Sequence, residues 1–205
     1  MVEMSWIRLA IAAGLATCFI YPSLIFVPLP RLVAITFAAA VGPLLGIASV
    51  GLYRLLRLHR RSVTSELGAI SNVLAGCLFS TMLLVQLAVR HRAGDLHAVT
   101  DQVLAVWLGL DVAWDAYIGL GTAMFAIAMW GHPRFGRWFA SSGLLIAGLM
   151  LAFNGYTFPD PPANSGLVDL GPLVGAWYLA ATIQTWRSLA WARSALATAS
   201  TDGAH

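Results

Sequence analysis

The sequence contains no lysine and little charge of either sign. Only 10% of its 205 residues are charged, and all twelve basic residues are arginines. Soluble domains carry about 25% charged residues, so the low charge excludes an ordinary soluble protein. The missing lysine excludes retinal or pyridoxal phosphate held as a Schiff base, because both cofactors bond to a lysine amine.

Cysteine is equally scarce, and the sequence has no nucleotide-binding motif. Cys18 and Cys77 lie inside apolar runs, where a cysteine is typical of packing rather than of redox chemistry or metal binding. There is no CxxC pair, no P-loop and no GxGxxG. We therefore predict no catalytic residue and no metal site, leave the cofactor open, and favour a protein without enzymatic activity.

Long apolar runs fill almost the whole chain. Six runs of 17 to 23 residues contain no Asp, Glu, Lys or Arg, and a helix that crosses a bilayer needs about 20 residues. The runs lack the alternation of a membrane β-barrel. We predict an all-α fold with one six-helix transmembrane domain over 1–187 and a cytoplasmic tail over 188–205. The predicted spans are 7–29, 32–54, 67–89, 102–130, 138–157 and 167–187.

The positions of the arginines predict how the helices are threaded. Nine of the twelve lie near the N-terminus, in the second-to-third and fourth-to-fifth loops, and near the C-terminus, and three lie on the other side. The positive-inside rule then places both termini in the cytoplasm. Because the basic residues are beside helix ends in short loops, they indicate topology, and we predict the lipid bilayer as a partner and no nucleic acid.

Two spans share a local glycine pattern. Residues 42–46 read GPLLG and residues 171–175 read GPLVG, so each stretch places two glycines four residues apart. Small residues at this spacing allow helix backbones to approach closely. We predict that both stretches are helix-packing faces.

Two carboxylates interrupt the fourth span. Asp111 and Asp115 are four residues apart, which places both on one face of a helix. On the predicted threading they lie in its outer half, and two carboxylates partly removed from water resist ionising together. They can share a proton, or a bound cation or hydrogen-bond donor can hold both ionised. An ionisable residue inside a span indicates a functional site.

Further polar side chains fall at the same predicted depth. The helix directions bring residues of the third, fifth and sixth spans into this outer layer, and two aromatic residues flank the aspartates. The predicted site for a ligand, an ion or a proton contains Asp111, Asp115, Trp114, Tyr117, Gln86, Asn154, Tyr156 and Asp169. The alternative is a structural polar network in which Asp115 bonds to neighbouring side chains. The rotation of each helix, which a sequence does not determine, decides between them.

Four histidines fall at predicted helix ends or in loops. They are His59, His91, His97 and His132. No two of them have the four-residue spacing of a helical metal site, so we predict solvated loop histidines. His97 and Asp101 are four residues apart near the outer surface, which leaves a metal ion at that position as the alternative.

Segments of the C-terminal half resemble a known group of proteins. The stretches HPRFGR (132–137), TFPDPP (157–162) and GLVDLGP (166–172), with Trp177-Tyr178 and Trp114-Asp115, are similar to segments of uncharacterised bacterial multi-helix membrane proteins. The resemblance implies a multi-pass protein of the bacterial inner (cytoplasmic) membrane, in a family without an assigned activity. It implies no catalytic residue.

Three functions fit these observations. The first is a protein that binds a small molecule, an ion or a proton through Asp111 and Asp115, as a transporter or sensor component. The second is a membrane enzyme acting on a lipid or isoprenoid-like substrate. Residues 111–115 (DVAWD) echo the paired aspartates of such enzymes, but their second acidic motif is missing. The third is a structural subunit of a membrane complex, or of a homo-oligomer, that uses the glycine-lined faces.

Overall fold

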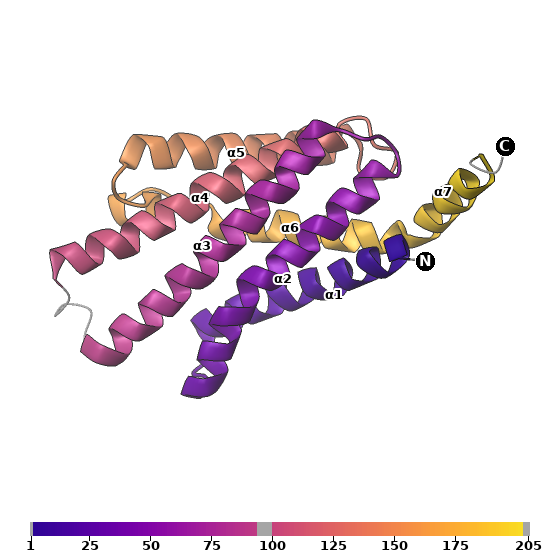
Figure 1. The fold of residues 1–205 in the computed structure, drawn as a ribbon. Helices are drawn as coiled ribbons and strands as arrows, with labels where there is room; N and C mark the ends of the chain where they lie inside the picture. Colours follow the sequence, from indigo (N-terminus) through magenta and orange to yellow (C-terminus); the bar gives the residue numbers. More distant parts are fainter. Residues whose placement is uncertain (1, 94–99, 203–205) are drawn as a thin grey trace.

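The computed structural model describes residues 2–93 and 100–202, and its fold is all-α, as predicted. In these two ranges, long helices follow one another with short connections (Figure 1). The elements are α1 (Val2–Phe26), α2 (Arg31–Arg57), α3 (Val63–Ala93), α4 (Asp101–Met129), α5 (Gly136–Thr157), the 3-10 turn η2 (Pro162–Ser165), α6 (Gly171–Arg187) and α7 (Leu189–Asp202).

Five of the helices, α1 to α5, are long and apolar enough to cross a membrane. The chain is therefore a multi-pass helical membrane protein. The sixth predicted span corresponds to α6, which has 17 residues. At a rise of 1.5 Å per residue, α6 is about 26 Å long, somewhat less than the roughly 30 Å hydrocarbon core. A sixth crossing stays a prediction.

The helices form a bundle in which neighbours in the sequence run side by side. Helices α1 to α5 pack in chain order, and α6 packs against both α1 and α5. Successive helices run in opposite directions, so the N-terminus and α7 lie at the same end of the bundle (Figure 1). We call this the terminal end and the opposite end the distal end. The arginine-rich α2–α3 and α4–α5 connections are also at the terminal end.

A proline inside α2 is accommodated by a side chain of α3. Pro43 has no N–H, so the Ala39 carbonyl loses its helical partner. The Ser80 hydroxyl donates to that carbonyl (3.3 Å) and accepts from the Gly42 N–H (3.0 Å). A Cβ on Gly42 would collide with the backbone of Gly76, so the two helices touch directly at this point. The predicted packing role of the 42–46 stretch is confirmed at Gly42.

The matching glycine stretch of α6 behaves differently, and its prediction as a packing face was wrong. Gly175 has no atom within 4 Å of the place where a Cβ would lie. A Cβ on Gly171 would meet only Asp169 (3.0 Å) and the Trp114 ring (3.8 Å). No helix approaches these glycines closely, because the space beside this part of α6 is a cavity that both glycines line.

The prediction of solvated histidines fails at His132, which is only 2% exposed. Helix α7 explains the burial, since its Trp191 ring packs edge-on against the imidazole (5.0 Å between centroids). The rings of His59 (5.2 Å) and Phe135 (5.3 Å) pack against it from other sides. His59 itself is exposed, as is His91. His97, and with it the alternative metal site, lies outside the described residues.

Candidate ligand-binding site

A cavity of about 320 Å³ lies in the distal half of the bundle. It extends along one side of α6, opposite the distal part of α1, and α2, α3 and α4 each contribute one or two side chains to its walls. Almost all of its lining is apolar. Lining residues that matter below are Tyr21, Phe79, Trp114, Gly171, Gly175 and Tyr178.

Three aromatic rings form one wall of this cavity. The rings of Phe79 and Trp114 are stacked (4.7 Å between centroids, 22° between planes), and Tyr21 meets Phe79 edge-on at 5.0 Å. Trp114 is 9% exposed, and among the described residues its indole N–H has no hydrogen-bond partner. Buried N–H groups are nearly always paired. The wall therefore presents aromatic rings to the cavity, and one of its members carries a buried N–H that is unpaired within the described part of the chain.

Three aspartates near this wall lie within electrostatic reach of one another. Asp111 and Asp115 of α4 interact electrostatically with each other and with Asp169, which precedes α6. Tyr21 lies within the electrostatic reach of all three. Asp169 accepts a hydrogen bond from the Gly171 N–H (2.8 Å), a free donor at the start of α6. Residues from three separate segments thus converge on one acidic cluster.

Asp115 is the most deeply placed of these carboxylates. It is 8% exposed, and the Asn154 amide of α5 donates to its Oδ2 at 2.9 Å. The same amide nitrogen also donates to the Met150 carbonyl (3.0 Å). The Asn154 carbonyl oxygen has no partner within the described part of the chain. Asn154 therefore holds the Asp115 carboxylate in a fixed position and leaves an acceptor of its own unused.

No arginine neutralises the acidic cluster in the described ranges. The ion pairs found there join Glu3 to Arg54 (3.1 Å) and to Arg57 (3.2 Å), at the terminal end. Arg90, near the distal end, lies over the Trp107 ring instead, 6.0 Å from its centroid. Asp111 is half-buried and Asp115 is buried, whereas Asp169 is exposed, and like charges repel each other more strongly where they are removed from water. The cluster therefore favours the uptake of a cation or of protons.

The structure brings five of the eight predicted site residues together. Asp111, Asp115, Trp114, Asn154 and Asp169 all belong to the cavity wall or the acidic cluster. The other three are elsewhere. Tyr117 is 40% exposed and Tyr156 is 84% exposed on the bundle surface, and Gln86 is half-buried without lining the cavity.

The structure contains a polar network halfway along the bundle that was not predicted from the sequence. The Asn72 amide donates to the Ser49 hydroxyl (3.0 Å) and to the Tyr178 hydroxyl (2.7 Å). The Thr122 hydroxyl donates to the Ile118 carbonyl (2.7 Å). The Tyr178 hydroxyl is therefore the donor in its hydrogen bond with Thr122 (3.1 Å). The network joins α2, α3, α4 and α6. The signal that marks it is Asn72 itself, an amide in the middle of an apolar run.

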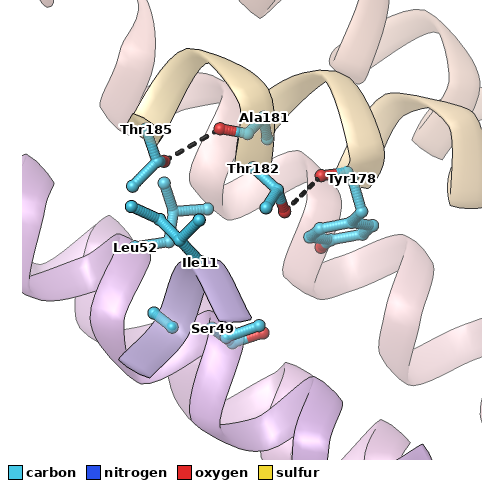
Figure 2. Close-up of a pocket in the computed structure, with 9 residues that line it drawn as sticks. Ile11, Ser49, Leu52, Tyr178, Ala181, Thr182 and Thr185 are labelled. Atoms are coloured by element: carbon cyan, nitrogen blue, oxygen red, sulfur yellow. Dashed lines mark hydrogen bonds between the residues drawn. The ribbon is translucent and has the colours of Figure 1, made fainter. Parts of the chain in front are cut away.

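A second, smaller cavity lies below this network, toward the terminal end (Figure 2). Its volume of about 20 Å³ fits one water molecule. Thr182 and Thr185 donate to carbonyls of their own helix, so their oxygens remain as acceptors facing Ser49 across the gap (Figure 2). Tyr178 lines both cavities and separates the larger from the smaller.

Comparison of the chain with protein-family models, with curated proteins and with solved structures found no match. The function must therefore be inferred from the chemistry of the distal cavity and of the aspartates beside it. That chemistry combines an apolar volume, an aromatic wall with a buried N–H unpaired among the described residues, and carboxylates without an arginine partner in the same ranges.

Proposed function

We propose that the protein binds a small organic cation in the distal cavity, as a component of a transporter or sensor. The observation that carries the proposal is the acidic cluster of Asp111, Asp115 and Asp169, which has no arginine partner in the described ranges. The aspartates do not line the apolar cavity themselves, but Asp115 follows the lining residue Trp114 and Asp169 accepts from the N–H of the lining residue Gly171. A cation bound there relieves the repulsion between the carboxylates.

The lining of the cavity favours an organic cation over a metal ion. Metal ions of the calcium and magnesium type need six or more oxygen ligands and give up their water reluctantly. The cavity offers aromatic and aliphatic carbon instead, and within the described residues no three His, Cys, Asp or Glu side chains are grouped to hold a metal. An alkylammonium group binds well against Tyr, Phe and Trp faces. Its carbon substituents fill the apolar volume.

The placement of the protein in a cell belongs to the same proposal. With the arginine-rich terminal end in the cytoplasm, the distal cavity faces the outer side of a bacterial inner membrane. The chain would then take its ligand from outside, alone or as part of a homo-oligomer or larger complex. An enzyme acting on a lipid or isoprenoid-like substrate remains a rival because of the DVAWD stretch at 111–115.

A structural role is the second candidate, and one contact favours it. The hydrogen bond from Asn154 to Asp115 links α4 to α5. If the role of Asp115 is to form this hydrogen bond, removing the bond lowers the stability of the bundle and leaves ligand binding unchanged. The two roles therefore predict different results for the same substitution.

The proposal is tested with benzyltrimethylammonium and its neutral isostere neopentylbenzene. Both have the same shape, and only the first is charged. We expect the cation alone to bind purified protein in equilibrium dialysis. Asp111→Asn and Asp115→Asn should each weaken binding about tenfold or more, the effect of losing a charged partner in a site shielded from water.

Asp160→Asn is the matched control, because Asp160 is an exposed carboxylate at the same distal end. It should leave binding unchanged. Equal binding of the cation and the isostere would overturn the proposal. A lower thermal unfolding temperature for Asp115→Asn, with unaltered cation binding, would establish the structural role in its place.

A further inference from the structure

The distal cavity has exposed lining residues on both α1 and α6, and we call this part of it the mouth. Two lining residues at the end of α1 are strongly exposed, Ile25 (54%) and Phe26 (80%). On α6 the exposed lining residues are Pro172, Gly175 and Ala176. None of these five carries a polar side chain. Exposed apolar side chains of this kind are compatible with contact with lipid hydrocarbon.

The seam between α1 and α6 explains why the mouth lies where it does. Toward the terminal end the two helices touch, because a Cβ on Gly14 would come within 3.0 Å of the Thr182 methyl group. The α1 residues that line the cavity begin at Thr17, beyond this contact, and those of α6 end at Leu179. The seam is therefore closed below the cavity and open beside it.

Polarity is distributed unevenly around the cavity. The carboxylates lie on α4 and just before α6, with Tyr21 within their electrostatic reach, whereas the mouth and most of the walls are hydrocarbon. A molecule that is complementary to both the carboxylates and the apolar walls has a compact cationic head and an extended apolar tail. A tail longer than the cavity can continue through the mouth into the bilayer.

We propose that the ligand is a single-chain amphiphilic cation that enters sideways from the distal leaflet between α1 and α6. This inference rests on the proposed function, since it assumes that the acidic cluster binds the cationic head. It adds the class of ligand and its route. The head binds beside the acidic cluster of Asp111, Asp115 and Asp169, and the chain lies along the α6 glycines and leaves through the mouth.

An alkyltrimethylammonium series from butyl to hexadecyl tests the route. Binding is measured in phosphatidylcholine nanodiscs and expressed against the ligand concentration in the membrane, which removes the gain from simple partitioning. A cavity open to lipid should bind longer chains with rising affinity until it is full and then with constant affinity. A cavity reached only from water excludes chains longer than itself. A fall of about tenfold from octyl to hexadecyl would overturn the inference.

Gly175→Leu blocks the mouth in a controlled way. Gly175 has room for a side chain, since nothing lies within 4 Å of its Cβ position. We expect it to weaken binding of the hexadecyl compound by about tenfold or more, and of the butyl compound much less. Gly148→Leu on α5 is the matched control, because Gly148 is exposed, equally unhindered and away from the cavity. Equal effects of the two variants on the hexadecyl compound would contradict the inference.

The two proposals fail in distinguishable ways. If benzyltrimethylammonium binds through Asp115 but long chains are excluded, the cation site stands and the lateral route is wrong. If no member of the alkyl series binds and benzyltrimethylammonium does not bind either, both proposals are wrong. If binding is insensitive to Asp115→Asn but follows chain length, the cavity binds hydrocarbon alone, and the cationic head is excluded.

Discussion

At the scale of single residues, His132 shows how burial alone sets a chemical property. The Arg134 N–H donates to its Nδ1 (3.2 Å), so the neutral ring carries its proton on Nε2. That buried Nε2 has no partner among the described residues. Burial, followed by the nearby charges of His59 and Arg134, lowers the pKa of His132 to about 4. The ring is therefore neutral at physiological pH.

This lowered pKa predicts a loss of stability in acid. In the unfolded chain the imidazole has a pKa of about 6.5 and takes up a proton below that pH. In the folded chain the His132 imidazole stays neutral down to about pH 4. Stability should therefore be constant above pH 6.5 and fall between 6.5 and 4, by at most about 3 kcal/mol. Unfolding midpoints of wild type and His132→Phe, compared across this range, measure the effect.

The difference in stability between those two proteins should become constant as the pH rises above the window. His91→Gln removes an exposed histidine and should retain the wild-type dependence. Identical pH profiles for wild type and His132→Phe would show that the buried imidazole contributes nothing.

At the scale of elements, α2 depends on a side chain from its neighbour. Pro43 interrupts the hydrogen bonds of α2, and Ser80 of α3 replaces the lost contacts at Ala39 and Gly42. In lipid no water is present to satisfy such groups. The helix therefore continues through its proline only because α3 lies against it.

Ser80→Ala should destabilise the bundle by about 1 to 2 kcal/mol, the range for interhelical hydrogen bonds in membranes. Adding Pro43→Ala should recover part of this loss, since residue 43 can then donate its own N–H to Ala39. Thr81→Ala is the control, because the exposed Thr81 hydroxyl bonds only within its own helix, to Cys77. Unfolding in detergent is measured for wild type, the single variants Ser80→Ala, Pro43→Ala and Thr81→Ala, and the double variant. If the changes in unfolding free energy of the two single variants simply add up in the double variant, this account is contradicted.

At the scale of the whole molecule, the acidic cluster lies away from most of the arginines. The arginine-rich connections, the beginning of α1 and α7 lie at the terminal end, and the acidic cluster lies in the distal half. This division places the carboxylates away from the arginines of the α2–α3 and α4–α5 connections. It also makes the orientation in the membrane an essential property, since it decides which compartment supplies the ligand.

Cysteine labelling in cells measures that orientation. In a background with Cys18→Ala and Cys77→Ala, Arg61→Cys marks the α2–α3 connection and Asn164→Cys marks η2; both positions are exposed. We expect a membrane-impermeant maleimide to label position 164 in intact cells and position 61 only after permeabilisation, as the arginine distribution predicts. The reverse pattern would place the distal cavity in the cytoplasm.

Local properties of the sequence determined the class of the protein. Apolar runs with few charges were enough to predict an all-α membrane bundle, because each backbone group in a bilayer must be satisfied within its own helix. The same runs indicated the depth of Asp111 and Asp115. Both properties depend only on which residues follow one another along the chain.

The tertiary structure decided which side chains meet. Depth along a helix follows from position in the sequence, but successive residues of a helix also point about 100° apart around its axis. Rotation and neighbours therefore brought Asp169 and Asn154 to Asp115 and left Tyr156 on the surface. The two glycine patterns make the same point. Gly42 meets a helix and Gly175 lines a cavity, because only one of them has a neighbour close by.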